Sequence, residues 1–308
     1  MNGGLNPELI LTSLDEVFFG GYDVDTHPAY ANATDGMIFG QDTATNSAVI
    51  SNVMGMPGLF TDVNEEEPAD NASIRSDHKA TQNVKNFKRN IPISKEYFDD
   101  EEHNSVNEQI RNLGNRARTS QDKNALDVYK NGFTTATVNS GTAIFADSHT
   151  TLSGDTVDNL ETGTLSHANL VTMQNSLADQ KAQDGELGGH LPAFLLVPTA
   201  LLDDAIEITK SRLQSGSADN NLNYFSEVFP GLQVKFSPLL GANYGGSDTA
   251  YFMGSRFTSM RRYVREGLYT RLTDWQYDEM DRYIYKAGFR ETVFAKSFEG
   301  LIASDGSV

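Results

Sequence analysis

The stretch NSVNEQIRNLGNRARTSQDKNALDVYKN, residues 104–131, constrains the fold of this chain more than any other. Its apolar residues recur every three or four positions, as in an amphipathic helix: Val106, Ile110, Leu113, Ala117 and then, after a polar gap, Ala125, Val128 and Tyr129. Such a helix would be roughly 40 Å long at about 1.5 Å per residue. Because the apolar stripe is narrow, we expect the helix to cross one face of a sheet rather than lie inside a core.

The sequence after this helix mixes helical and strand patterns. We expect a helix over residues 166–182 and, because an unbroken apolar run follows, a buried strand over 191–197. Another helix should start with Thr199 as its N-cap. Its inward-facing residues would be Ala205, Ile206, Thr209 and Leu213. Residues 260–303 read as strand, turn, long strand and strand, so the pattern as a whole indicates an α+β fold.

Two segments before the helix lack the apolar residues needed to build a core of their own. Residues 1–59 are rich in Gly, Asn, Thr and Ala, so they are either a disordered tail or an extended arm that borrows burial from neighbours. Apolar clusters such as 17–19 favour the arm. Residues 74–98 read as a polar hairpin, which would be marginal on an isolated monomer and is therefore expected to be supported by another subunit.

Charge is strongly clustered around this hairpin. Residues 60–70 carry five acidic side chains and no basic one, and residues 96–102 do the same. Residues 74–95 between them carry six basic side chains against one acidic one. On a chain with a net charge of −18, this pattern is either a solvated surface or a device for docking onto an acidic surface of another copy.

The composition limits the class of protein. The 308 residues, 38% of them hydrophobic, suit one large unit or two modest domains, and the absence of cysteine excludes disulfides and thiolate metal sites. No apolar run is long enough to span a bilayer, and residues 1–14 do not resemble a secretory signal, so we expect a soluble protein made in the cytosol. The acidic balance argues against tight nucleic-acid binding.

No pattern of catalytic or metal-binding residues stands out, so we expect no enzyme activity, cofactor or metal. The six histidines lack metal-ligand spacing, and neither a Gly-x-Ser-x-Gly elbow nor a phosphate-binding loop occurs. The acidic run 62–70 lacks the spacing of a calcium loop. Asp278, Glu279 and Asp281 lie near Trp275 and Tyr277 and suggest either a sugar-cleaving carboxylate pair or, more simply, exposed charges.

Four stretches, in their order and spacing, resemble the Hong Kong 97-type major capsid proteins, closest to the Mu-like major head subunits. They are GTAIFADSH at 141–149, LSHANL at 165–170, GELGGHLPAFLLVPTAL at 185–201, and the C-terminal strands from YFMG at 251–254 through 281–289 to 296–298. The resemblance covers most of residues 74–308.

The resemblance implies an N-terminal arm at 1–59 and an extended loop at 60–103. It further implies a peripheral domain at 104–159 with its spine helix at 104–131, an axial domain at 160–255, and return strands at 256–308. The implied function is a major capsid protein of a tailed bacteriophage, assembled in the host cytoplasm into an icosahedral shell of hexamers and pentamers. The shell would enclose double-stranded DNA without specific binding.

The implied partners are a portal protein, a decoration protein and, because the chain leaves no room for a scaffolding region before its arm, a separate scaffolding protein. Alternatives are the shell of an encapsulin-like compartment, a tail tube or decoration protein, and a soluble hydrolase.

The basic segment supplies the candidate inter-subunit contacts of this shell. They are Lys79, Lys85, Lys88 and Arg89, which would lie on the extended loop. Some members of the family form a covalent lysine–asparagine link between subunits. Lys79, Lys85 and Lys88 lie in the corresponding loop, but no partner asparagine or catalytic glutamate can be assigned, so crosslinking is not predicted.

Overall fold

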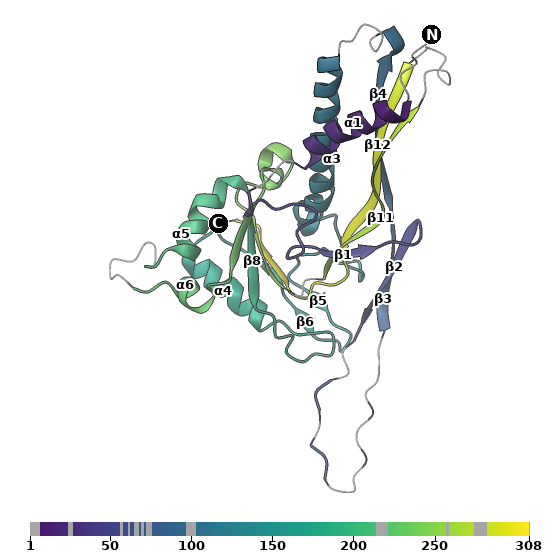
Figure 1. Ribbon diagram of the computed structural model, residues 1–308. Coiled ribbons are helices and arrows are strands. Elements are labelled where there is room, and N and C mark those ends of the chain that lie inside the picture. The colour runs from purple at the N-terminus through teal and green to yellow at the C-terminus, as the bar shows by residue number, and fades with distance from the viewer. Residues whose placement is uncertain are drawn as a thin grey trace.

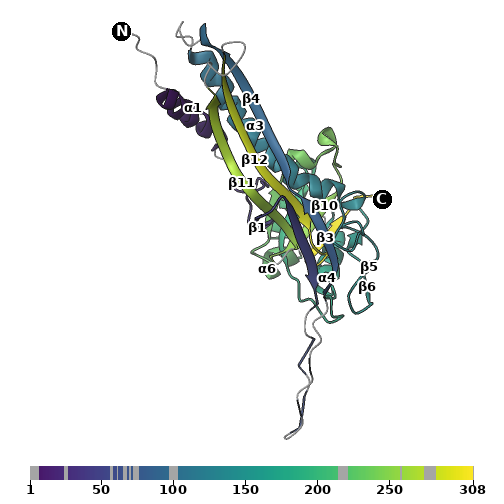
Figure 2. The ribbon, with the colours of Figure 1, turned by 90° about the vertical axis from the view of Figure 1, so that its right-hand side faces the viewer.

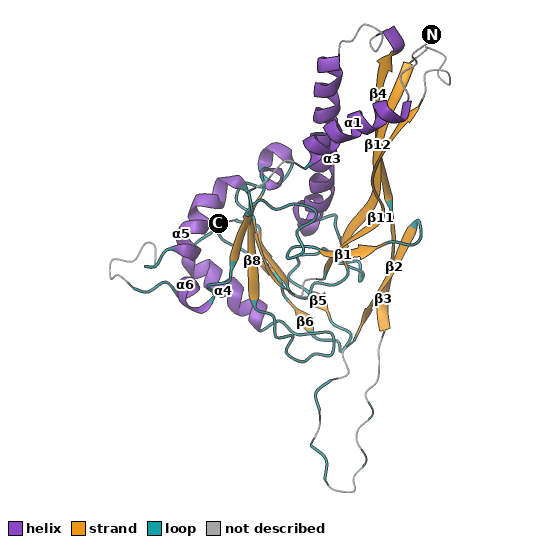
Figure 3. Cartoon of the chain, viewed as in Figure 1, coloured by secondary structure: helices purple, strands orange, loops and turns teal. Residues whose placement is uncertain are grey.

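The computed structural model describes residues 7–23, 27–55, 58–60, 62–64, 68, 71, 76–96, 103–213, 221–256, 259–273 and 282–307. The molecule is elongated (Figure 1). A long helix and a four-stranded sheet form one end, a five-stranded sheet with short helices forms the other, and a hairpin extends away from both (Figure 3). The mixture of helices and largely antiparallel strands confirms the predicted α+β class.

The predicted long helix is α3, His103–Lys130, followed by the 3-10 turn Asn131–Phe133. Its sheet has the order β1-β11-β12-β4, and Figure 2 shows the long strands side by side with α3 behind them. The strands are β1 (Gly40–Thr43), β11 (Met260–Thr273), β12 (Arg282–Ala295) and β4 (Lys85–Ser94). The helix crosses one face of this sheet over its first half, as expected. Its last turns instead enter the main core, where Ala125, Leu126 and Tyr129 are fully buried.

Residues 1–59 are expected to be a disordered tail or an extended arm that borrows burial from neighbours, and in the part that the structure describes they are buried against other elements of the same chain. Helix α1, Pro7–Tyr22, packs Leu14 and Phe18 against α3 and the four-stranded sheet. Further along, Ile38 and Phe39 are fully buried in the main core. The apolar residues are few, but each meets partners from distant parts of the sequence, so the segment needs no core of its own.

The crossing of α1 and α3 depends on two glycines. A Cβ atom on Gly114 would collide with the carbonyl oxygen of Phe18, and one on Gly21 with the carbonyl oxygen of Arg111. Two helices can approach this closely only where no side chain separates their backbones.

Gly114→Ala is therefore expected to force the helices apart and to lower the free energy of unfolding by about 1–3 kcal/mol, the usual range for overpacking. Gly20→Ala is the matched control, since a Cβ atom there meets nothing within 4 Å. Urea unfolding of both purified subunits measures the difference. Equal stability of the two variants would show that the helices can separate without loss.

The interpretation of residues 74–98 as a hairpin is also wrong. Strands β3, Ser76–Asn83, and β4 are separated only by Val84 and do not pair with each other. β3 pairs with β2, Ala48–Met54, whereas β4 pairs with β12. The hairpin is thus β2–β3, and the basic segment runs on from it into the four-stranded sheet.

The five-stranded sheet has the order β7-β13-β10-β8-β9. Its strands are β7 (Leu160–Glu161), β13 (Leu301–Ser304), β10 (Tyr251–Ser255), β8 (Pro192–Val197) and β9 (Gln233–Phe236). Three helices pack on one face, α4 (His167–Ala178), α5 (Leu202–Lys210) and α6 (Tyr224–Val228). The other face joins the main core, together with α3 and the N-terminal segment. The two-stranded pair β5 (His149–Thr150) and β6 (Thr156–Val157) lies beside this sheet (Figure 1).

Two details of the predicted helix after residue 198 need correction. Thr199 is not the N-cap but lies in the 3-10 turn Thr199–Leu201, and α5 begins without a side-chain cap. Ala205 and Thr209 are buried as expected. Ile206 is exposed because Ile208 lies on the inner face instead, and Leu213 is exposed beyond the end of the helix at Lys210. The remaining short 3-10 turns are Pro238–Leu240 and Ala242–Tyr244. In the described part of the chain, no helix has the length and apolarity to cross a bilayer.

Candidate inter-subunit surface

The four candidate contact residues lie on two different strands. Lys79 is exposed on β3, in the hairpin, while Lys85, Lys88 and Arg89 are exposed on β4. β4 is an edge strand whose other side pairs with β12, with Lys88 opposite Gly288 and Arg89 opposite Ala287. All four side chains are exposed, but the shared hairpin expected for them does not exist.

Lys85 differs from the other three because it contacts its own chain. Its Nζ atom donates a hydrogen bond of 3.3 Å to Oδ1 of Asn124 on α3. Among the described residues, neither Lys88 nor Arg89 has an ion pair. These two cations are accordingly more available to a partner than Lys85 is.

A groove of about 460 Å³ lies between β4 and α3. Three cationic residues are among those that line it, Lys88 and Arg89 of β4 and Arg116 of α3. The apolar residues that line it are Phe87, Leu113, Ala117, Leu268, Ala287 and Phe289. The rings of Phe87 and Phe289 stack with centroids 4.8 Å apart, which stiffens the β4 side of the groove. A second hollow, lined by Gln109, Asn112 and Pro92, continues the groove along the helix.

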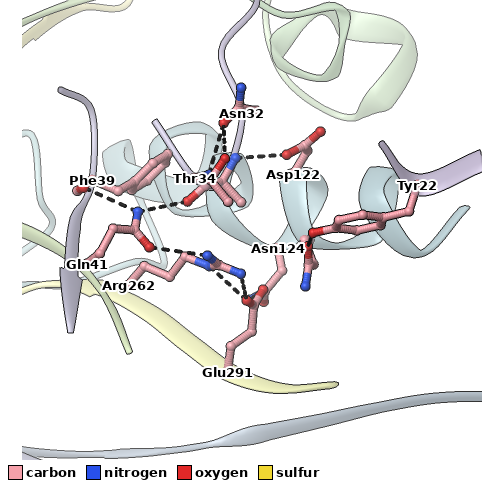
Figure 4. Close-up of polar contacts among 11 residues, drawn as sticks. Tyr22, Asn32, Thr34, Phe39, Gln41, Asp122, Asn124, Arg262 and Glu291 are labelled. Atoms are coloured by element: carbon pink, nitrogen blue, oxygen red, sulfur yellow. Dashed lines mark hydrogen bonds and ion pairs between the residues drawn. The ribbon is translucent and has the colours of Figure 1, made fainter. Parts of the chain in front are cut away.

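Beneath this surface, a buried polar network joins four elements (Figure 4). Arg262 on β11 donates from Nε and Nη2 to Oε2 of Glu291 on β12, at 2.8 and 2.6 Å. Oε1 of Glu291 accepts from Nδ2 of Asn124 at 3.1 Å, and Nη1 of Arg262 donates to Oε1 of Gln41 at 3.2 Å. Both charged side chains are almost fully buried. The network holds α3, β11, β12 and β1 in one fixed arrangement, and Lys85 caps it at the surface.

Asp122 anchors the N-terminal segment to the same helix. It is buried and accepts a hydrogen bond of 2.8 Å from the backbone N–H of Ala33 (Figure 4). Burial raises the pKa of its carboxyl group to about 6, although the hydrogen bond and the charges of Arg118 and Arg262 act in the opposite direction. Because the folded-state pKa lies above the unfolded value, the folded state binds this proton more tightly. The contribution of Asp122 to stability therefore falls as the pH rises from about 4 through about 6.

Asp122→Asn should remove this pH dependence, because an amide oxygen can still accept the hydrogen bond from Ala33 but does not ionise. We expect the variant to be more stable than the natural subunit by about 1–3 kcal/mol above pH 7 and not at pH 4. Urea unfolding of both proteins at several pH values between about 4 and 8 measures the difference. A stability difference that does not change with pH would contradict the assignment to Asp122.

Charge is unevenly distributed among the elements of the fold. Elements β4, α3, β11 and β12 contain 15 Lys and Arg residues against 5 Asp and Glu residues, a net charge of +10. Since the whole chain carries −18, the rest carries −28. Each copy thus combines a basic set of packed elements with a strongly acidic remainder.

The family model for phage capsid proteins matches residues 79–304, about three quarters of the chain. The chain belongs to the phage capsid protein family. The match begins within β3 and ends with β13, so it includes α3, the whole five-stranded sheet and all strands of the four-stranded sheet except β1. No curated protein sequence matches the chain significantly.

Solved capsid structures share the fold along nearly the whole chain. The virus-like particle from Pyrococcus furiosus is 8% identical, with 96% of this chain and 99% of that chain covered and a TM-score of 0.56. The capsid of Myoviridae phage XM1 is 11% identical, with 92% of this chain and 94% of that chain covered and a TM-score of 0.51. The capsid of a native GTA particle is 11% identical, with 94% of this chain and 97% of that chain covered and a TM-score of 0.56.

These matches confirm the predicted Hong Kong 97-type fold and the function as a major capsid protein that assembles with its own copies into a shell. The closer kinship with Mu-like head subunits stays a prediction.

Several sequence-based hypotheses about chemistry fall partly outside the described residues. Asp278, Glu279 and Asp281 lie in an undescribed segment, as do Glu65, Glu66, Glu67 and Asp70 of the acidic run. In the part that is described, no three His, Cys, Asp or Glu side chains gather closely enough to hold a metal ion.

The sequence reasoning missed two features of the surface, the contribution of Arg116 and the Arg262–Glu291 pair. The Arg262–Glu291 pair does leave a sign in the sequence, because Glu291 is a charged residue within the largely apolar end of β12, RETVFA at 290–295.

Proposed function

We propose that this capsid protein forms the icosahedral head of a tailed phage as hexamers and pentamers of itself, closed around double-stranded DNA. The family match carries the proposal, because it includes every strand of the two sheets from β3 onward. The net +10 layer and −28 remainder support it further, since each subunit then carries both halves of a repeated contact. Lys79, Lys88 and Arg89 are the proposed contact residues, whereas Lys85 acts mainly within its own subunit.

The proposal includes the proteins with which such subunits work: a separate scaffolding protein, a portal protein and a decoration protein, with assembly in the host cytoplasm. It assigns the protein a structural role without catalysis. In support of that role, conspicuous buried polar groups such as Arg262, Glu291 and Asn159 hydrogen-bond to neighbouring elements of the fold.

A compartment shell that holds a cargo protein is the second candidate, since the Pyrococcus furiosus particle shares the fold to the same degree as the GTA capsid. The contents of purified particles separate the two, because a phage head yields DNA and a compartment yields a second protein.

Expression with a scaffolding protein should give particles of megadalton size by gel filtration and closed shells by electron microscopy. A stable monomer at micromolar concentration under those conditions would contradict the proposal. The purified subunit should not bind duplex DNA with sub-micromolar affinity at about 150 mM salt, because even non-specific DNA-binding proteins bind more weakly there.

A further inference from the structure

Among the histidines whose burial the structure describes, only His149 is almost fully enclosed, with 1% of the residue exposed. Its imidazole stacks on the ring of Phe298, with the centroids 4.7 Å apart. Nε2 lies 3.0 Å from Oδ1 of Asn159, which is itself fully buried. A side chain that can take up a proton near neutral pH is therefore held inside the fold, at the start of β5.

Asn159 determines which nitrogen of His149 carries the proton. Nδ2 of Asn159 donates to two carbonyl oxygens, those of Ile144 at 2.9 Å and Leu301 at 3.2 Å. Oδ1 accepts from the backbone N–H of Ala146 at 3.0 Å. Turning the amide over would place its N–H groups against another N–H, so the orientation is fixed. Because Oδ1 can only accept, Nε2 of His149 is the protonated nitrogen of the neutral ring.

The other nitrogen, Nδ1, is then an acceptor. It is buried and has no hydrogen-bond partner among the described residues. A second proton would have to go to Nδ1, which would create a buried cation whose new N–H has no acceptor in the described part of the fold. The geometry thus holds the ring in its neutral form.

We propose that His149 is an acid-sensitive contact that holds the segment 144–159 against strand β13. The neutral ring keeps Asn159 in place, and a protonated ring would loosen it. Asn159 is the connection at stake, since its side chain donates to the carbonyl of Leu301 and its backbone carbonyl accepts from the N–H of Ala303 at 3.1 Å. Because Ile144 lies in the main core and β13 in the five-stranded sheet, loosening Asn159 weakens the link between the two.

The charges around the ring oppose this effect but do not cancel it. Burial lowers the pKa of His149, whereas the oxygens of Asn159 and Ile144 and the carboxylates of Asp158 and Asp147 act in the opposite direction. Both carboxylates belong to exposed residues, where water screens them. Since the folded-state pKa lies below the ordinary value of 6.5, the open or unfolded chain binds this proton more tightly. The stabilising contribution of His149 is therefore present above about pH 6.5 and is lost as the pH falls through the folded-state pKa.

Two buried carboxyl groups respond to acid in the opposite sense. Glu299, next to Phe298, accepts a hydrogen bond of 3.1 Å from the backbone N–H of Gln183, and burial raises its pKa. Burial also raises the pKa of Asp122 on α3. Both groups bind protons more tightly in the folded subunit, so their contributions grow as the pH falls. Only comparison with a variant that lacks the imidazole isolates the effect of His149.

Hydrogen exchange of peptides covering residues 144–159 and 301–304 tests the proposal, in the natural subunit and in His149→Gln at pH 7 and pH 5. The glutamine amide can still donate to Asn159 but does not ionise. From pH 7 to pH 5, exchange in the natural subunit relative to the variant should rise at least about threefold and at most about thirtyfold, the limit set by an open-state pKa of about 6.5. Intrinsic exchange rates cancel because both proteins are compared at the same pH. His27→Gln is the matched control, since His27 is exposed on the N-terminal segment, and it should behave as the natural subunit does.

A ratio that does not change with pH, or a change that His27→Gln abolishes as well, would overturn the inference. If His149→Gln does not fold, nitrogen-15 NMR of the natural subunit decides. The His149 ring should show the tautomer protonated at Nε2 and should titrate at a lower pH than the histidines of the urea-unfolded chain. The Nδ1 tautomer, or titration at the same or a higher pH, would overturn it. Both measurements concern a single subunit, so they are independent of whether the assembled particle is a phage head or a compartment.

Discussion

Arg262→Met is expected to lower the free energy of unfolding of the subunit by about 3–5 kcal/mol. The substitution removes the guanidinium that pairs with Glu291, whose side chain is almost completely buried. A carboxylate left in the interior without its cation carries the full penalty of lost hydration, which is why breaking one partner of a buried pair is strongly destabilising. Asn124 can still donate one hydrogen bond to Glu291 but cannot neutralise its charge. Urea unfolding of the unassembled subunit measures the loss.

Arg261→Met, one position earlier on the same strand, is the matched control. Arg261 and Asp42 are 3.8 Å apart with both side chains more than a third exposed, so this change should cost less than about 1 kcal/mol. Adding Glu291→Gln to Arg262→Met should recover more than half of the lost stability, because the amide keeps the hydrogen bond from Asn124 without a charge. Equal losses for Arg261→Met and Arg262→Met would show that burial of the pair is not what matters.

The elements that sequence reasoning placed correctly are those whose pattern is local. Helix α3 follows from its apolar period, and β8 follows from its unbroken apolar run. Helix α1 has a local pattern as well, since Leu11, Leu14 and Phe18 have helical spacing, but it stands in a segment rich in Gly, Asn, Thr and Ala, which favours a tail or an extended arm.

Strand pairing was misassigned because it is not local. The polar alternation of residues 76–94 suits a hairpin as well as two strands with distant partners, and only the three-dimensional positions of β2 and β12 decide between them.

The groove was beyond the reach of sequence reasoning for the same reason. Lys88 and Arg89 stood out because the basic segment is contiguous, whereas Arg116 lies on another element and joins them only when α3 packs beside β4. The apolar lining adds Leu268 and Phe289 from strands near the C-terminus. A surface assembled from three distant segments leaves no pattern along the chain.

Tyr129→Ala is expected to cost about 3–5 kcal/mol of stability, the usual range for removing a large aromatic ring from a core. Tyr129 is fully buried near the end of α3, in the core shared by the two sheets. Its ring contacts those of Phe39, Phe145 and Phe252, with centroids 5.9, 6.3 and 5.3 Å away. These three rings come from the N-terminal segment, the loop after α3 and β10, so one side chain joins the long helix to three separate parts of the chain.

Tyr129→Phe separates the contribution of the ring from that of the hydroxyl. The hydroxyl is buried and has no hydrogen-bond partner among the described residues, and burial raises the pKa of this tyrosine. Removing an unsatisfied buried donor while keeping the ring should leave the subunit equally stable or more stable by about 1 kcal/mol. Urea unfolding of both variants tests the pair. A loss of several kcal/mol in Tyr129→Phe would show that the hydroxyl has a partner, and a small loss in Tyr129→Ala would show that the three phenylalanines can close the cavity without it.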